Sequence, residues 1–225
     1  MIQLDDLKKY ILVLATNEDR LNNANYLKNT YFNDLEFRYV INSPFDKISM
    51  DKLKKLPQLE LSIWKEKFPH YRNINEYSCA FEHYRIIKEA YILKYPYVFI
   101  IEDDIAVEYD IDLVNKFLYH APENFDMLKL GYWPHNIITE EYEDTKKLYE
   151  EDGIYWVKSN DMLRYGTQAN IYSYNGMHKY LKFQEKTFCT ADLWTYIPNN
   201  DKKYISTIPL FKESNKLFKS TIHKS

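Results

Sequence analysis

Three consecutive carboxylates, Glu102-Asp103-Asp104, directly follow an apolar run at 97–101 in this chain. The run reads as a strand buried on both faces, and adjacent charges at its end are costly unless a cation meets them. In extended chain, Glu102 and Asp104 would project to one side and Asp103 to the other. Two carboxylates on one side suit Mg²⁺ or Mn²⁺ that also binds ligand phosphates. A charged turn that caps the next helix is the simpler alternative.

A second candidate is Asp192, in the segment Ala191-Asp192-Leu193-Trp194. A carboxylate within hydrogen-bond reach of a hydroxyl can act as its general base. The neighbouring Trp194 has a ring suited to stacking on a sugar face. Aspartate is also favoured immediately before a helix, so a helix cap is the alternative for Asp192.

Basic and imidazole side chains supply further candidates. Arg20, just after the first predicted strand, suits a phosphate or a uracil edge, and an exposed helix arginine is its alternative. His83 follows Cys79 by one helical turn, where a lone histidine is more often a hydrogen-bonded core residue than a ligand. The basic tail at 212–225 suits an anionic membrane surface or a frayed end, and His223 would reach a metal if the tail folded back.

Composition limits the class of protein. The net charge of −3 argues against general nucleic-acid binding. No apolar stretch approaches the roughly 20 residues of a membrane-spanning helix, and the acidic N-terminus does not resemble a signal peptide. Two cysteines without a Cys-x-x-Cys pair argue against a structural zinc site. We therefore expect a cytoplasmic protein with at most peripheral contact at the inner face of a membrane.

Alternating strand and helix patterns predict an α/β fold. The polar turn after the first strand predicts a helix capped by Thr16 or Asn17, and the acidic segment 134–161 reads as a loop or lid. The first two predicted strands, with the predicted helix between them, indicate a βαβ unit and therefore a parallel sheet. The predicted strands are 10–15, 37–41, 97–101, 126–130 and 168–174, and the other predicted helices are 76–92, 112–120 and 176–183.

The order of these motifs resembles glycosyltransferase family 25, the lipopolysaccharide and lipooligosaccharide galactosyltransferases, which also includes collagen galactosyltransferase domains. The segment 75–83 shares Glu76, Cys79 and His83 with the family pattern Gly-Glu-x-Gly-Cys-x-x-Ser-His. The Glu-Asp-Asp triplet follows at the expected distance. Three later segments also resemble family motifs: Phe125-Asp126-Met127-Leu128-Lys129-Leu130-Gly131, Gly166-Thr167-Gln168-Ala169-Asn170-Ile171-Tyr172-Ser173 and Ala191-Asp192-Leu193-Trp194.

The resemblance implies a GT-A fold with a Rossmann-like, mostly parallel central sheet flanked by helices. It implies a single domain over 1–225, with a nucleotide-binding half at about 1–105 and an acceptor half at about 106–225. The implied chemistry is inverting transfer of a hexose, commonly galactose, from a UDP-sugar to a glycan acceptor, with Mn²⁺ or Mg²⁺ bound.

The resemblance also implies roles for individual residues. Glu102 and Asp104 would be metal ligands, and Asp192 would be the base. His223 is a further metal-ligand candidate only on the ground given above, that the tail folds back. The residues expected to line the donor site are Ala15, Thr16, Arg20, Asn42, His83, Glu102, Asp103, Gly166 and Thr167.

Two other functions remain as alternatives. A non-catalytic relative that binds sugar or assists assembly fits the replaced glycines at 75 and 78. A metal-dependent phosphohydrolase fits less well, because such sites usually assemble separated Asp and His ligands around two metals. Here one acidic cluster follows a strand.

Overall fold

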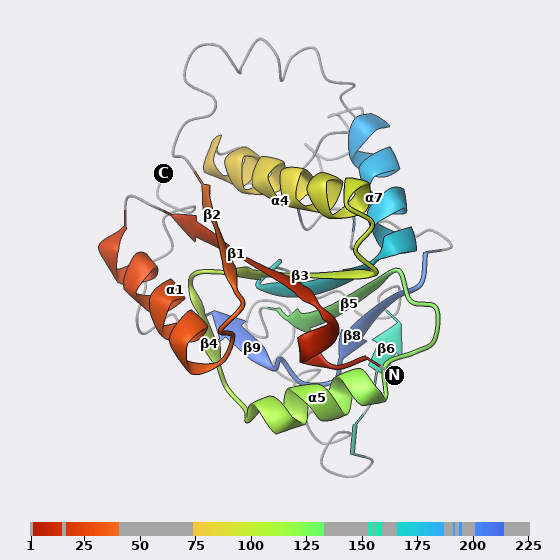
Figure 1. Ribbon diagram of the computed structural model, residues 1–225. Helices are drawn as coiled ribbons and strands as arrows, with labels where there is room; N and C mark the ends of the chain where they lie inside the picture. The colour runs from red at the N-terminus through yellow and green to blue at the C-terminus, as the bar shows by residue number, and fades with distance from the viewer. Residues whose placement is uncertain are drawn as a thin grey trace, which may run out of the picture.

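One mixed β-sheet with helices on both faces forms the described part of the computed structural model (Figure 1). That part comprises residues 2–14, 17–40, 74–132, 153–154, 156–158, 166–186, 191, 194 and 201–213. The strands are β1 (Lys8–Leu14), β2 (Glu36–Val40), β3 (Tyr97–Glu102), β4 (Ile105–Val107), β5 (Met127–Gly131), β6 (Trp156–Lys158), β7 (Ala169–Ser173), β8 (Lys203–Ser206) and β9 (Phe211–Glu213). The helices are α1 (Glu18–Thr30), α4 (Ile74–Ile92), α5 (Ile111–Tyr119) and α7 (Tyr174–Lys186), after a short turn of 3-10 helix at Leu4–Asp6.

The sheet has the strand order β2-β1-β3-β7-β5-β8-β6, and β9 joins it through β5 and pairs with β4. β1 is parallel to both β2 and β3, and β5 is parallel to β8. β7 lies antiparallel between β3 and β5, so these two strands point the same way. The carboxyl ends of β1, β3, β5 and β8 therefore share one edge, which is where open α/β sheets bind ligands.

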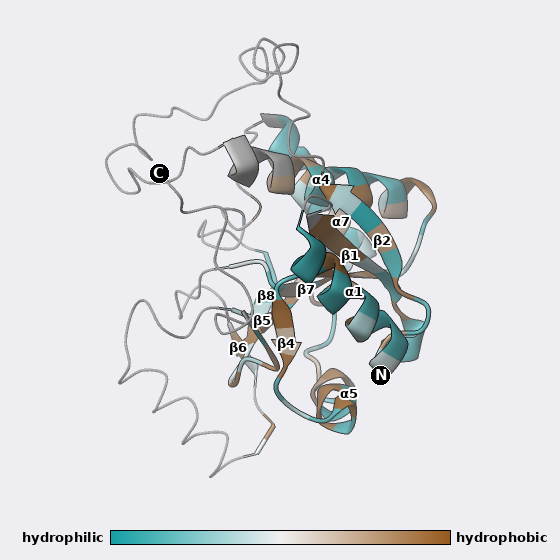
Figure 2. Ribbon diagram, turned by 90° about the vertical axis from the view of Figure 1, so that its left-hand side faces the viewer, coloured by the Kyte–Doolittle hydropathy of each residue, from teal (hydrophilic) through white to brown (hydrophobic). Residues whose placement is uncertain are grey.

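Apolar strands hold the layers together. Val98, Phe99, Ile100 and Ile101 of β3 are all fully buried, as expected for a strand covered on both faces. Residues of α4 and α7 pack on one face of the sheet, and residues of α1 and α5 pack on the other. Figure 2 shows brown in β1, β4 and β5, whereas the outward helices α1 and α7 are largely teal.

Most predicted elements are confirmed with ends shifted by a few residues. Asn17 caps α1, because its side-chain oxygen accepts from the Arg20 backbone N–H at 3.2 Å. Four short strands were missed, namely β4, β6, β8 and β9. β6 lies inside the segment read as a loop or lid, so that reading was wrong for 156–158. None of the described helices has the length and apolar character needed to cross a membrane.

Gly176 lets α7 begin directly against the chain entering β5. A Cβ at this position would lie 1.7 Å from the Asp126 carbonyl oxygen. The Asp126 carboxylate accepts from Asn175 Nδ2 at 2.6 Å and from Lys179 Nζ at 2.5 Å. The start of α7 is therefore fixed by close backbone approach together with two polar contacts.

Gly176→Ala should lower the free energy of unfolding by about 2 kcal/mol or more, because the added methyl meets backbone that cannot rotate away. Urea unfolding measures this change. Lys182→Ala, on the exposed side of the same helix, is the matched control and should change it by less than about 0.5 kcal/mol. Equal stability of the two variants would contradict the close approach.

Lys203 of β8 is a fully buried lysine. Its Nζ donates to the Trp194 carbonyl oxygen at 2.6 Å and lies 4.9 Å from the Trp194 ring centroid. Burial lowers the pKa of Lys203 to about 8, although Asp201 and Asp126 oppose the shift. Because an unfolded lysine titrates near pH ~10.4, the unfolded chain binds more protons than the folded chain between these values.

The unfolding free energy should therefore rise with pH through this window relative to Lys203→Met. We expect the difference between wild type and variant to grow by roughly 1–3 kcal/mol from pH ~7 to ~10.5. Chemical unfolding at several pH values measures it, and the subtraction removes the titration of other groups. A difference that stays flat across this range would show that Lys203 keeps an ordinary pKa.

Candidate functional site at the end of strand β3

The acidic triplet divides between two helices on opposite faces of the sheet. β3 ends at Glu102, and Asp103 and Asp104 form a turn before β4. The Glu102 side chain contacts α4, whereas Asp103 and Asp104 both contact Arg20 of α1. The expectation that Glu102 and Asp104 share one side was wrong, because strand alternation stops where the strand ends.

Helix α1 fixes the acidic turn. Arg20 donates from NH1 to Asp103 Oδ1 and from NH2 to Asp104 Oδ2, each at 2.8 Å. Asn23, one turn later on the same helix face, donates to the carbonyl oxygens of Asp103 and Ile105 at 2.8 Å. The turn is thus held through both its side chains and its backbone.

The Arg20 ion pairs are buried, with the guanidinium side chain 7% exposed. Burial alone would lower the pKa of Arg20, but Asp104 and Asp103 outweigh it and raise the pKa. The alternative of an exposed helix arginine is therefore wrong. Both terminal nitrogens of Arg20 already serve carboxylates in this conformation, so its use by a phosphate stays a prediction.

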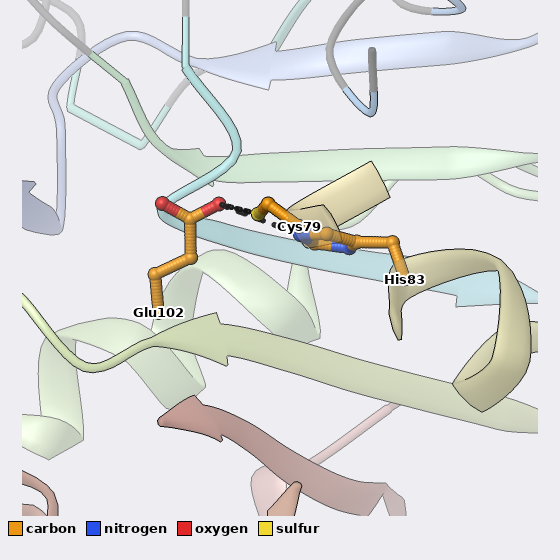
Figure 3. A group of neighbouring side chains, drawn as sticks. All are labelled: Cys79, His83 and Glu102. Carbon is orange, nitrogen blue, oxygen red and sulfur yellow. Dashed lines mark hydrogen bonds and ion pairs between the residues drawn. The ribbon is translucent and has the colours of Figure 1, made fainter. Parts of the chain in front are cut away.

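Glu102 is the acceptor at the centre of a second cluster (Figure 3). Its Oε1 lies 3.7 Å from Cys79 Sγ and 3.4 Å from His83 Nε2. The Thr167 hydroxyl also donates to this oxygen. Cys79 and His83 come from successive turns of α4, and Thr167 comes from the segment that enters β7, so two separate elements converge on the carboxylate at the end of β3.

The surroundings favour an ionised Glu102 beside a neutral thiol. Burial pushes the pKa of Glu102 upward, but hydrogen bonds from His83 and Thr167 and the charge of Arg20 bring the net pKa below its usual value. Burial, followed by the charge of Glu102, raises the pKa of Cys79 well above its ordinary value. A free thiolate nucleophile is therefore disfavoured at Cys79.

The segment entering β7 brings Thr167 to the cluster. The Glu102 backbone N–H donates to the Gln168 carbonyl oxygen at 3.0 Å, which aligns this segment with the end of β3. Gly166 has φ of +94°, a conformation that glycine adopts readily and other residues rarely do. This gives a physical reason for glycine directly before Thr167.

Sequence reasoning missed two buried polar residues near this cluster. Asn170 of β7 is fully buried and aligns with Lys129 of β5, which is also fully buried. Neither side-chain atom of the Asn170 amide has a hydrogen-bond partner within the described part of the chain. The sequence did contain a signal that could have identified them, because a lysine and an asparagine are unusual inside apolar strand patterns.

The structure brings some predicted site residues together and leaves others undescribed. Arg20, His83, Glu102, Asp103, Asp104, Gly166 and Thr167 all lie around the end of β3. Ala15, Thr16, Asn42, Asp192 and His223 lie outside the described residues. Trp194 is 1% exposed and stacks on Tyr172 at 6.0 Å, so its predicted role as a sugar-stacking surface was wrong.

The described donors do not form an all-oxygen site of the kind that Mn²⁺ or Mg²⁺ prefers. Asp103 and Asp104 each give an oxygen to Arg20, and Glu102 gives its Oε1 to Cys79, His83 and Thr167. Cys79 Sγ, a ring nitrogen of His83 and a Glu102 oxygen instead lie within 4.8 Å of one another. Sulfur, imidazole and carboxylate together suit a softer cation than Mg²⁺.

Comparison with known proteins yields a weak likeness. No family model and no curated protein matches the chain. The crystal structure of A197 from STIV aligns with 91% of this chain and 83% of its own, at a TM-score of 0.46 and 11% sequence identity.

Arg20→Met should reduce the unfolding free energy by about 3–5 kcal/mol, because it leaves two carboxylates buried without their guanidinium. Arg20→Lys should reduce the unfolding free energy by an intermediate amount. Its ammonium keeps the positive charge but cannot donate to the two carboxylates from two separate nitrogens. Urea unfolding at neutral pH compares these variants with wild type.

Arg38→Met is the matched control, because Arg38 pairs with Glu89, whose side chain is 41% exposed and keeps contact with water when the pair is lost. It should cost about 1 kcal/mol or less. If Arg20→Met cost no more than Arg38→Met, the ion pair would not be what holds the acidic turn.

Proposed function

We propose that the protein is a glycosyltransferase that moves a hexose from a UDP-sugar to a hydroxyl of a glycan acceptor. The observation that carries this proposal is the acidic turn Glu102-Asp103-Asp104 at the carboxyl edge of the sheet. The turn follows the strand that pairs with the opening βαβ unit, and the loop at Gly166–Gln168 lies against it. Nucleotides bind at this edge in open α/β sheets.

A divalent cation is part of the proposal. Glu102, Asp103, Asp104 and Arg20 carry formal charges of three minus and one plus, a sum of −2 that such a cation would offset. A cation here would neutralise the diphosphate as its bond to the sugar breaks. Binding of Mn²⁺ or Mg²⁺ by Glu102 together with Asp104 would require one of these side chains to turn, since Glu102 contacts α4 whereas Asp104 contacts Arg20 of α1.

The remaining roles follow the family resemblance. Asp192 is the proposed base that takes the proton from the acceptor hydroxyl, as inversion at the anomeric carbon needs one base on the acceptor side. Galactose is the proposed sugar, and the acceptor is a lipid-linked or protein-linked glycan. Ala15, Thr16, Asn42 and His223 keep their proposed places around the donor and the metal.

A non-catalytic sugar-binding relative is the second candidate. The ion pairs of Arg20 with Asp103 and Asp104 favour it, because charges that pair with one another within the protein can serve a purely structural role. The two candidates differ in turnover, since a transferase slowly hydrolyses its donor when no acceptor is present.

A panel of UDP-, GDP- and CMP-sugars with Mn²⁺ or Mg²⁺ tests the proposal by thermal shift and by donor hydrolysis. UDP-sugars should raise the unfolding temperature by a few degrees at about 100-fold excess over Kd, and EDTA should remove the shift. Asp104→Ala should lose the metal-dependent shift while keeping its folded circular dichroism spectrum.

Asp192→Asn should lower the hydrolysis rate by about 10²-fold or more while leaving the thermal shift in place. The control is Asp112→Asn, an exposed change on the distant helix α5. A shift without hydrolysis in wild type would favour the non-catalytic relative. No response to any nucleotide sugar with either metal would overturn the proposal.

A further inference from the structure

We propose that Cys79, His83 and Glu102 form a binding site for a borderline divalent cation, with Zn²⁺ as the expected occupant. The three ligand atoms, one sulfur, one imidazole nitrogen and one carboxylate oxygen, all lie within 4.8 Å of one another. Figure 3 shows the three side chains converging from helix α4 and the end of β3. This inference does not depend on sugar transfer, and it competes with the pairing of Glu102 and Asp104 around Mn²⁺ or Mg²⁺, because Glu102 is a ligand in both.

The spacing of the ligand atoms fits tetrahedral zinc. Typical zinc bonds of ~2.3 Å to sulfur and ~2.0 Å to nitrogen and oxygen place tetrahedral ligands about 3.5 Å apart for S···O and about 3.3 Å for N···O. The observed separations are 3.7 Å for Cys79 Sγ to Glu102 Oε1 and 3.4 Å for His83 Nε2 to the same oxygen. These two separations match tetrahedral zinc to within a few tenths of an ångström, and the sulfur and the imidazole nitrogen lie within 4.8 Å of each other.

The supporting elements are suited to a preformed site. Cys79 and His83 are four residues apart on α4, so they occupy the same helix face one turn apart. Glu102 is the last residue of a strand whose preceding four residues are fully buried. The Thr167 hydroxyl already donates to Glu102 and would orient the carboxylate as outer contacts do in metal sites.

The ligand chemistry selects the cation. Thiolate and imidazole favour Zn²⁺ over Mg²⁺ or Mn²⁺, which prefer oxygen ligands. Zinc binding replaces the sulfur–hydrogen bond of Cys79 with a sulfur–zinc bond, and the thiol proton passes to the solvent. The proton that His83 Nε2 donates to Glu102 moves to Nδ1 of the same ring, which frees Nε2 for zinc and leaves the net release at one proton. Three protein ligands leave a fourth position open, and the Glu102 side chain is 17% exposed, which gives that position access to solvent.

The alternative is that this cluster binds no cation. Cys79, His83 and Thr167 then remain simple hydrogen-bond donors to a buried carboxylate. This arrangement predicts no thiolate, no metal stoichiometry and no proton release on adding zinc.

Cobalt substitution in the full chain tests the site. The protein is stripped with EDTA, desalted under reducing conditions and titrated with Co²⁺ without any nucleotide. We expect one equivalent to produce a thiolate-to-cobalt charge-transfer band and the intense visible bands of tetrahedral cobalt. Zn²⁺ should abolish these bands on displacement, and an indicator dye should record release of about one proton per zinc.

Matched variants assign the ligands. Cys79→Ser should lose the charge-transfer band, and Glu102→Gln should weaken Co²⁺ binding by roughly tenfold or more. Cys189→Ser and His120→Gln, which keep all three proposed ligands, should bind as wild type does. Retention of the band in Cys79→Ser, or its loss in Cys189→Ser, would overturn the assignment.

If the ligand variants fail to fold, alkylation of the wild-type chain still tests the metal site. One equivalent of Zn²⁺ should slow iodoacetamide labelling of Cys79 at least tenfold, as read from the mass of its peptide. Unchanged labelling of Cys79, or the absence of cobalt bands from stripped wild type, would establish the hydrogen-bonded cluster in place of a metal site.

Discussion

The ion pairs from Arg20 to Asp103 and Asp104 determine where the chain goes after the central strand. Two carboxylates buried at the end of β3 would be too costly without a cation, and α1 supplies one at 2.8 Å from each. Because α1 also packs on the sheet, its position and the path from β3 into β4 are set together. Asn23 adds two backbone contacts to this arrangement.

This arrangement leaves Glu102 available to the opposite face of the sheet. As the last residue in extended conformation, Glu102 still obeys strand alternation and projects toward the α4 face, where Val98 and Ile100 also point. The two aspartates belong to the turn and project to the α1 side. Three adjacent acids therefore meet different partners, and they differ in what they can bind.

Much of the sheet was predictable because its buried strands are mainly apolar. β1 and β3 contain continuous apolar runs, β5 and β7 are largely apolar around Lys129 and Asn170, and α4 and α5 have helical patterns. The short strands β4, β6, β8 and β9 did not, since three or four residues carry little periodic signal and their pairing partners lie far along the chain. The antiparallel placement of β7 between β3 and β5 likewise depends on long-range pairing that no local pattern encodes.

The sequence indicated which residue types form the candidate site but not which of them contact one another. A triplet of acids after a buried strand and an arginine after the first strand were visible in the sequence. The pairing of Arg20 with Asp103 and Asp104 required the packing of α1 beside β3, and the contact of Cys79 and His83 with Glu102 required the register of α4 over the sheet.

Ligand softness distinguishes the two sides of this site. On the α1 side, Asp103 and Asp104 offer hard oxygen ligands, but each has an oxygen bound to Arg20. On the α4 side, sulfur and imidazole join one carboxylate oxygen within a few ångströms. On the α1 side, a hard cation such as Mg²⁺ would have to compete with the Arg20 guanidinium for the aspartate oxygens. On the α4 side, a borderline cation such as Zn²⁺ would have to displace only protons. Adjacent acidic residues at the end of β3 therefore face two different sets of donor atoms, and the identity of any bound metal would reveal which side the protein uses.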